Sequence, residues 1–211
     1  MRNRLTLFLL LALPFVMLSC EDDDDDPMPP LRMEFVEVFT DSKSVVDYIM
    51  TDEGERLSPA STISASRPDT TYRCVCQYAM ENGKCNVYDL RSIYSKKPVR
   101  MAESDTLWTD PMKVNSVWKT SRYVNMSLAL LTNGQGSHAY TFVEDTVMTG
   151  TEGHKTAYCT VTHHRVGIDP ESYTQNVYLS MPVYDYVDSG IDSVAVSINT
   201  YSGLKQYMFK L

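Results

Sequence analysis

The sequence has few basic residues and almost no clustering of them, and this scarcity limits the partners it can bind. Its 211 residues include 19 Lys and Arg against 27 Asp and Glu, a formal net charge of −8. The compact basic group is Lys96-Lys97 with Arg100, flanked by Pro98, which is typical of a solvated linker. Binding to a phosphate backbone depends on clustered Lys and Arg. We therefore expect no nucleic-acid partner.

The sequence also lacks an apolar run long enough to cross a membrane. Its longest run, residues 5–18, contains Pro14 and is shorter than the roughly 20 residues that a spanning helix needs. Arg2 and Arg4 precede this run, and small residues end it. A basic start, a short apolar core and a small-residue end are the pattern of a cleaved export signal. We expect residues 1–19 to be removed as a signal peptide.

The end of this segment, Met17-Leu18-Ser19-Cys20, resembles the lipobox of bacterial lipoproteins, which is cut before the cysteine. Met17 departs from the leucine that the pattern prefers, and an ordinary secretory signal with an unrelated cysteine is the alternative. By resemblance, Cys20 carries two or three acyl chains, and several chains anchor a protein firmly. The resemblance therefore implies membrane attachment through lipid on Cys20.

A charged spacer follows the cysteine. Glu21 and five aspartates at residues 22–26 precede three prolines. The like charges repel one another and offer no apolar surface to bury, and the prolines stiffen the chain, so we expect residues 20–30 to form an extended tether. Calcium binding is the alternative, but the run lacks the glycine and alternating ligands of a calcium loop. Acidic residues at this position resemble the surface-export signal of lipoproteins from Bacteroides-like bacteria. This resemblance implies an outer-membrane protein exposed at the cell surface.

Most of the negative charge belongs to this tether. Loss of Arg2 and Arg4 with the signal takes the net charge from −8 to −10, and six of these charges lie in residues 21–26. The folded part is therefore only mildly acidic.

No catalytic constellation is visible. Adjacent residues of a strand face opposite sides, so His163 and His164 cannot both bind one metal without a bulge. A Cys-His hydrolase would need an orienting group and an oxyanion hole, and no glycine-rich phosphate loop follows a predicted strand. We expect no enzyme activity, no metal and no cofactor. The other groups considered are Cys159, His154 and Glu152 as metal ligands, and the carboxylate pairs Asp185/Asp188 and Glu144/Asp145, which solvated turns explain.

Four further cysteines lie in the body. Export makes disulfides possible, but the two-residue turn Asn82-Gly83 sets a register with Met80 opposite Cys85 and Cys76 opposite Asp89. Cys76 and Cys85 are then too far apart to bridge. We favour reduced thiols packed in the core; a disulfide to Cys159 and a zinc site are the alternatives. The four are Cys74, Cys76, Cys85 and Cys159.

The body has the pattern of an all-β protein, with β-branched and tyrosine residues alternating with polar ones between short turns. Residues 42–50 offer the best helix pattern and fit it poorly. Charge and proline at residues 96–105 suggest a boundary between domains at 31–100 and 101–211. The predicted strands are residues 34–40, 45–51, 71–80, 84–88, 114–118, 122–131, 139–144, 156–165, 175–183, 193–200 and 204–211, with 90–95 as a strand or short bridge. Such spacing favours barrels or sandwiches.

Several short motifs resemble the NigD-like lipoproteins of Bacteroides-type bacteria. They are Leu57-Ser58-Pro59, Asp110-Pro111-Met112-Lys113-Val114, Trp118 and Tyr123-Val124-Asn125-Met126, with Val124 in place of the usual leucine. The resemblance covers roughly residues 30–211. It implies an OB-like amino-terminal barrel followed by a carboxy-terminal β-sandwich. The family takes its name from a bacteriocin operon, and no biochemical activity follows from membership.

Within these motifs, two residues have packing roles to expect. Trp118 is predicted to be a core anchor, because a buried tryptophan removes 150–250 Å² from water in typical proteins. Asn125 falls on the polar face of its strand, where we expect it to cap a neighbouring loop.

The 14 tyrosines suggest sugar binding, since OB-like barrels bind oligosaccharides on one strand face. Tyr184 and Tyr186, on one face of a predicted extended segment, are the candidate ligand-binding pair; half-buried packing is the alternative. We expect an envelope-anchored, non-enzymatic interaction or structural module of unknown ligand. The alternatives are a surface protein that binds a glycan or small ligand, in the barrel or the cleft between domains, and a bacteriocin-associated protection protein.

The anchor can be tested directly. The substitution Cys20→Ala removes the thiol that would carry lipid, so radiolabelled fatty acid should no longer be incorporated and the protein should leave the membrane fraction. A variant that stays membrane-bound would show that the lipobox interpretation is wrong.

Overall fold

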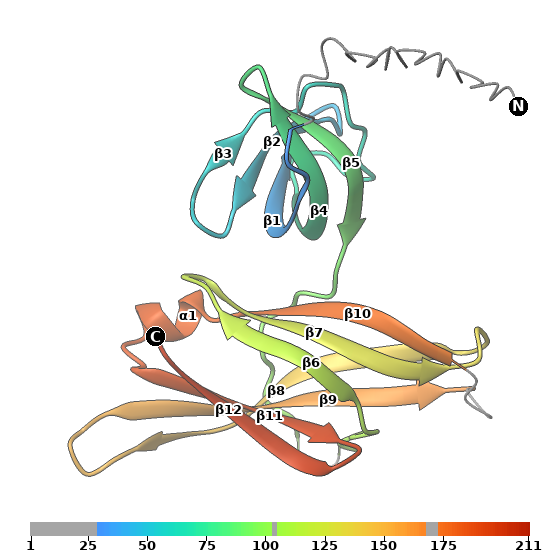
Figure 1. Cartoon of the computed structure of the whole chain (residues 1–211). Coiled ribbons are helices and arrows are strands. Elements are labelled where there is room, and N and C mark those ends of the chain that lie inside the picture. Colours follow the sequence, from blue (N-terminus) through green and yellow to red (C-terminus); the bar gives the residue numbers. More distant parts are fainter. Residues whose placement is uncertain (1–28, 103–104, 168–172) are drawn as a thin grey trace, which may run out of the picture.

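The computed structural model describes residues 29–102, 105–167 and 173–211. The signal segment, Cys20 and the acidic run lie outside these ranges. Within them the chain forms β-strands and one short helix, arranged as two β domains (Figure 1). The strands are β1 Arg32–Thr40, β2 Val46–Thr51, β3 Arg56–Leu57, β4 Thr71–Glu81, β5 Lys84–Ser92, β6 Lys113–Lys119, β7 Tyr123–Thr132, β8 Ser137–Thr149, β9 Lys155–Val166, β10 Tyr173–Pro182, β11 Ser193–Thr200 and β12 Gly203–Lys210; the helix is α1 Tyr184–Asp188.

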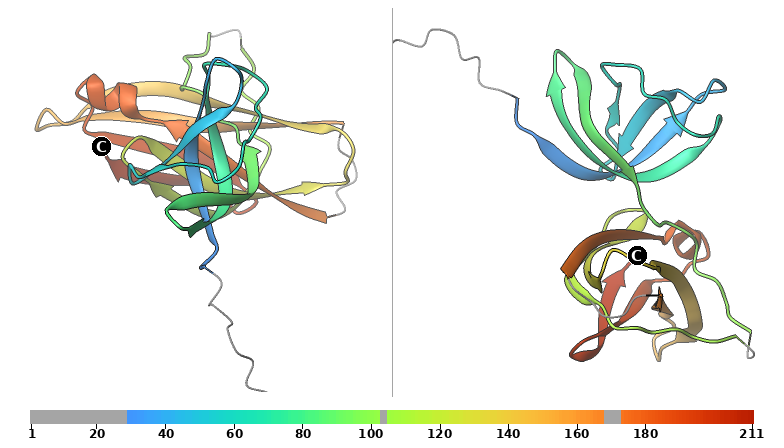
Figure 2. Two further views of the ribbon diagram at one scale, coloured as in Figure 1. Left: turned by 90° about the horizontal axis from the view of Figure 1, so that it is seen from above. Right: turned by 90° about the vertical axis from the view of Figure 1, so that its right-hand side faces the viewer.

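The amino-terminal domain is one curled antiparallel sheet in the order β3-β2-β1-β4-β5, and the right-hand view of Figure 2 shows its curvature. Its two ends approach each other after β3, where Cys85 accepts a hydrogen bond from the Ala60 amide and donates its own amide to Ser58, both at 2.8 Å. The inner face buries Val36, Ile49 and other apolar side chains. This half-barrel agrees with the all-β, OB-like expectation.

The cysteines of this domain lie in that core, as predicted. Cys74, Cys76 and Cys85 are buried, free thiols, and so is Cys159 in the second domain. Asn82 and Gly83 both have positive φ, 51° and 73°, which the two-residue hairpin turn requires. Met80 lies opposite Cys85, as predicted, but a bulge at Gln77 and Tyr78 shifts the register beyond it.

The prediction that Cys76 faces Asp89 was therefore wrong. Its partner is Leu90, and Asp89 pairs with Gln77. A bulge inserts one unpaired residue into a ladder, and counting back from the turn cannot reveal it.

The connection between the domains is hydrogen-bonded to the second one from Tyr94 onward. Tyr94 accepts from the Ser180 amide of β10 at 3.0 Å, and Val99 pairs with β8. Further on, the Asp110 amide donates to His163 of β9 at 2.9 Å and the Met112 amide donates to Asn199 of β11 at 3.0 Å. Successive positions of this connection therefore supply short pairings to the sandwich, at Tyr94, Val99, Asp110 and Met112.

The carboxy-terminal domain packs a sheet in the order β10-β7-β6 against a sheet in the order β12-β11-β9-β8. The strand pairings are antiparallel except for β9 with β11, which are parallel. The predicted alternation in β7 is confirmed on one side, because Val124, Met126, Leu128 and Leu130 are fully buried in the core between the sheets. This layered packing is the β-sandwich expected from the sequence.

The structure differs from the sequence expectations at its one described helix. Residues 42–50 form a turn and β2, whereas α1 begins at Tyr184, inside a segment predicted to be extended. Five residues are too few for a periodic apolar pattern, so sequence reasoning missed this helix. Within the described ranges, no helix combines the length and apolar character that crossing a bilayer requires.

Candidate functional site

The candidate site is the junction between the two domains, where the outer faces of two sheets meet. Strand alternation turns Phe35, Glu37 and Arg73 away from the half-barrel core. The same alternation turns Tyr123 and Asn125 of β7 away from the sandwich core. These side chains are nevertheless buried, because each face covers the other.

Arg73 of β4 is the centre of this junction, with only 4% of its side chain exposed. Its guanidinium forms an ion pair with Asp52 at 2.6 Å and a hydrogen bond with the same carboxylate at 2.7 Å. It also donates to Ser180 Oγ at 2.9 Å and to Asn125 Oδ1 at 3.1 Å. Burying a charge is costly unless it is paired and hydrogen-bonded, and here the second domain supplies two of the acceptors.

Two further bonds close this network. Asn125 Nδ2 donates to Asp52 Oδ2 at 2.9 Å, and Ser180 donates to Asn125 Oδ1 at 2.6 Å. Asn125 therefore holds a side chain from the turn after β2, in line with the capping role expected for it. The amide group of the Asn125 side chain uses both its NH2 donor, toward Asp52, and its carbonyl acceptor, toward Arg73 and Ser180, which fixes the orientation of the side chain.

A second buried pair lies beside the first. The hydroxyl of Tyr123 donates to the carboxylate of Glu37, and Arg122 lies 3.6 Å from the same carboxylate. The Arg73 guanidinium stacks 3.9 Å from the centre of the Tyr123 ring. Burial raises the pKa of Tyr123, and the bond to Glu37 raises it further, so this phenol stays protonated and donates.

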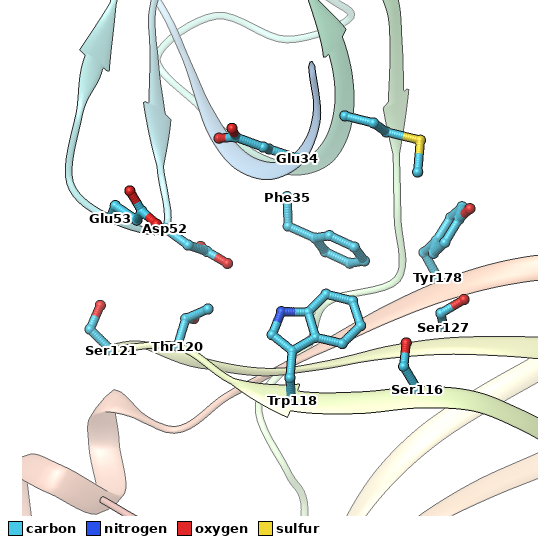
Figure 3. Close-up of a pocket in the computed structure, with 11 residues that line it drawn as sticks. Glu34, Phe35, Asp52, Glu53, Ser116, Trp118, Thr120, Ser121, Ser127 and Tyr178 are labelled. Atoms are coloured by element: carbon cyan, nitrogen blue, oxygen red, sulfur yellow. The ribbon is translucent and has the colours of Figure 1, made fainter. Parts of the chain in front are cut away.

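A groove with a volume of about 710 Å³ opens on one side of the network. We call it the Trp118 groove. Figure 3 shows Trp118 rising from β6 toward Phe35 of β1, with Tyr178 beside them and Asp52 and Glu53 at the opposite end. The lining is Met33, Glu34, Phe35, Asp52, Glu53, Ser116, Trp118, Thr120, Ser121, Ser127 and Tyr178.

Trp118 is therefore not the core anchor that the sequence suggested. It is half-buried on the outer face of its sheet, and its ring meets Phe35 at 5.0 Å and 88°. Sequence alone predicts that a tryptophan will be buried. It does not show whether the side chain packs in the core of its own domain or against a neighbouring domain.

Two smaller hollows continue the groove around the junction. One of about 510 Å³ shares Asp52, Glu53 and Ser121 with the Trp118 groove. The other, of about 370 Å³, contains Arg122 and Lys97 and reaches Tyr184. The junction thus offers an uninterrupted series of lining residues contributed by both domains.

The predicted pair Tyr184 and Tyr186 does not form one binding face, because both lie in α1 rather than in an extended segment. Tyr184 lines the smallest of the three hollows, with Lys97 and Arg122 at 5.2 and 5.1 Å from its ring centre. Tyr186 instead donates to Glu144 at 2.9 Å and lies 3.4 Å from Cys159. A helix turns successive residues by about 100°, so positions two apart point in different directions.

The histidines at 163 and 164 point to opposite sides of β9, as strand alternation predicts. His163 is buried, with Nδ1 3.0 Å from the Asp110 carbonyl and Nε2 2.9 Å from His138 Nδ1. His164 stacks on Trp108 at 4.0 Å. Because a carbonyl only accepts, His163 carries its proton on Nδ1 and accepts from His138 through Nε2.

The other metal candidates do not gather with these histidines. His154 lies 4.0 Å from Glu152 and 3.7 Å from Asp192, at an exposed turn. Cys159 contacts Tyr186 instead, and burial raises its pKa to about 11. No group of three or more ligating side chains in the described residues could hold a metal ion.

The carboxylate pairs have separate partners. Glu144 binds Arg100 at 2.6 Å, Asp145 accepts from Thr160 at 2.8 Å and Asp185 pairs with Lys97 at 2.8 Å.

Comparison with known proteins identifies the family. Residues 95–211 match the model of the NigD-like C-terminal beta sandwich domain, which is more than half of the chain. The chain belongs to the NigD-like family. No curated protein matches it significantly.

Solved structures cover both domains of this NigD-like protein. A "NigD-like immunity protein" from Bacteroides caccae is 25% identical with a TM-score of 0.68, and the match covers 86% of this chain and 98% of the other. A "Putative TOXIN related protein" from Parabacteroides distasonis is 17% identical with a TM-score of 0.67, covering 86% and 93%. A "Putative lipoprotein" from Bacteroides fragilis is 10% identical with a TM-score of 0.55, covering 86% and 97%.

Sequence reasoning missed the residues that centre the NigD-like junction. Arg73 lies in a predicted strand and Asp52 directly follows one, and no sequence motif marks either residue. A usable signal existed in the motif Tyr123-Val124-Asn125-Met126, whose outward residues are a tyrosine and an asparagine that the structure buries. A polar outward face that is also rich in large side chains indicates a covered surface.

We predict that Arg73→Met destabilises the protein by about 2–4 kcal/mol, because Asp52 is left largely buried without its cation. Loss of the pair should also separate urea unfolding into two transitions, since the domains no longer share this network. The double variant with Asp52→Asn should lose less than the sum of the two single variants. Circular dichroism during urea titration measures all of these.

The control is Arg91→Met, which breaks the exposed Arg91–Asp89 pair at 2.7 Å. It should change stability by no more than about 1 kcal/mol. Equal losses for Arg73→Met and Arg91→Met would contradict the role given to Arg73.

His163 should make stability depend on pH. Burial lowers its pKa to about 4 from the ordinary value of 6.5, so between these values the unfolded chain binds a proton that the folded protein excludes. Stability should therefore be full above about pH 6.5 and fall as the pH drops to about 4, by roughly 3 kcal/mol. Urea midpoints of the wild type and His163→Gln across this range test it.

The variant should show a shallower slope; a residual slope is expected from His138, whose pKa burial also lowers. The exposed His154, changed to Gln, is the control and should leave the slope unchanged. Parallel curves for the wild type and His163→Gln would refute the assignment.

Proposed function

We propose that this NigD-like protein is a lipid-anchored envelope protein that works as a non-enzymatic binding module, with the Trp118 groove as its ligand site. The observation that carries the proposal is the joint construction of the groove. Phe35 and Asp52 come from the half-barrel and Trp118 and Tyr178 from the sandwich, and buried polar bonds hold the two walls in register. Ligand sites are often found at such domain junctions.

The location rests on the first 30 residues. The lipobox at Cys20, the acidic run and the prolines support attachment to the outer membrane at the cell surface, with a spacer before β1. The Bacteroides fragilis neighbour bears the word lipoprotein in its name.

The state of the nucleophilic and basic groups supports binding rather than catalysis. Burial raises the pKa of Cys76 to about 12 and that of Cys85 to about 11, which keeps both thiols protonated and unreactive. Both ring nitrogens of His163 are hydrogen-bonded, Nδ1 to the Asp110 carbonyl and Nε2 to His138. The groove itself contains neither cysteine nor histidine among its lining residues.

A binding screen tests the proposal. The full chain in detergent is titrated by calorimetry with neutral oligosaccharides, uronic-acid oligosaccharides, and cationic and anionic decapeptides. We expect at least one probe to bind saturably, to bind at least tenfold more weakly to Trp118→Ala, and to be recovered chemically unchanged. Leu204→Ser, on an exposed position of β12, is the control for surface changes.

Binding that is unchanged in Trp118→Ala would show that the ligand site is not the Trp118 groove. Turnover of a probe would show that the protein is an enzyme. Absence of binding to every probe would count against the binding module itself.

A second candidate function is protection against a secreted toxin. It is favoured by the Bacteroides caccae neighbour, which is named an immunity protein. The gene neighbourhood discriminates: an adjacent toxin gene favours protection, and adjacent polysaccharide-use genes favour a glycan ligand.

A further inference from the structure

The charges around the Trp118 groove are largely compensated, and this narrows the chemistry of its ligand. The lining has three carboxylates and no Lys, Arg or His. Asp52 is neutralised by Arg73 at 2.6 Å. Glu34 lies close to Arg32 and the hydroxyl of Tyr78. Glu53 is exposed and is left as the one carboxylate of the lining without a cation among the described residues.

This balance disfavours two ligand classes. An anionic ligand would meet carboxylates with no accessible cation in the lining, because Arg73 is buried and its charge is already paired with Asp52. A strongly cationic ligand would find a single uncompensated charge, where a surface pair contributes about 1 kcal/mol or less. A neutral ligand with many polar groups fits the balance better.

The floor of the groove alternates flat aromatic surface with small polar groups. Strand register places Trp118, Asn125 and Ser180 in one row across β6, β7 and β10, and Ser116, Ser127 and Tyr178 in the next row. Phe35 stands above both rows, perpendicular to Trp118 at 5.0 Å and to Tyr178 at 5.7 Å. The arrangement therefore offers apolar ring faces directly beside hydroxyl groups.

The hydroxyls are available to a ligand. Ser116, Ser121 and Ser127 make no side-chain hydrogen bond to another described residue, and each hydroxyl can donate one bond and accept two. Glu53 adds a carboxylate that can accept hydrogen bonds at the end of the groove opposite Tyr178. Short donors and acceptors around an aromatic platform are complementary to a sugar ring, which has an apolar C–H face and a polar rim of hydroxyls.

We propose that the Trp118 groove binds a neutral oligosaccharide, with one sugar ring stacked on Trp118 and bonded to Ser116 and Ser127, and a further sugar unit of the same chain bonded to Glu53. This inference rests on the proposed function, since it names the ligand class of the same groove. The volume of about 710 Å³ is sufficient for a short oligosaccharide rather than a single ring.

The sequence supplies a specific reporter. It contains two tryptophans, and Trp108 lies away from the groove, stacked on His164. In the full chain with Trp108→Phe, tryptophan emission reports on Trp118 alone. The probes are neutral hexasaccharides of glucose, mannose and xylose in α and β linkages, oligogalacturonate, and Lys-rich and uncharged decapeptides.

We expect a saturable change in Trp118 emission with at least one neutral oligosaccharide, and none with oligogalacturonate or the peptides. Calorimetry with that sugar should show binding weakened at least tenfold by Trp118→Ala and about threefold to tenfold by Ser127→Ala and Glu53→Gln. Tyr184→Ala, in the hollow beside Arg122 and outside the lining of the Trp118 groove, should bind like the parent, which also tests the tyrosine predicted from sequence.

The outcomes separate the two proposals. A groove-dependent response to a peptide without any response to sugars would overturn the carbohydrate inference and leave the binding module standing. Sugar binding that is weakened by Tyr184→Ala but not by Trp118→Ala would also overturn it. No response of Trp118 to any probe would count against both.

Discussion

The guanidinium of Arg73 is buried between two β domains, and the arrangement of those domains depends on how its charge is compensated. Asp52 provides the opposite charge from the same domain, but Ser180 and Asn125 of the other domain complete the hydrogen bonds. A buried ion that lacks partners costs several kcal/mol. The half-barrel therefore cannot move away from the sandwich without exposing or orphaning this group.

The groove follows from that constraint. Arg73, Asn125 and Ser180 hold the two sheet faces together at one point, and the faces diverge on either side because twisted sheets meet over a limited area. Phe35 and Trp118 stay close to the point of contact, with their rings perpendicular at 5.0 Å. A site built this way is made of rigid strands rather than loops, which suits recognition by preformed shape.

The family motifs gain a physical meaning at this junction. Trp118, Tyr123 and Asn125 belong to the motifs that resemble the family, and all three face the amino-terminal domain. Met112 from the Asp-Pro motif is fully buried in the sandwich, and Asp110 accepts a hydrogen bond from the Arg165 amide at 2.8 Å. The Asp-Pro motif thus fixes the long connection to the second domain. Trp118 and the motif that begins at Tyr123 hold the first domain against the second.

Much of the strand pattern could be predicted from sequence because alternation and turn chemistry are local. Asn82-Gly83 allowed a positive-φ hairpin, and the apolar residues of β7 alternated toward one core. The bulge at Gln77 and Tyr78, the helix at Tyr184 and the burial of Arg73 escaped prediction. Each of these features depends on which part of the folded chain packs against the residues concerned, and a single sequence does not contain that information. The sequence by itself determined most of the strands, the turns and many of the core-facing residues; the export signal that it predicts lies outside the described residues. Only the tertiary structure decided that polar outward faces cover each other, because burying Arg73 requires acceptors that lie 52 and 107 positions away along the chain.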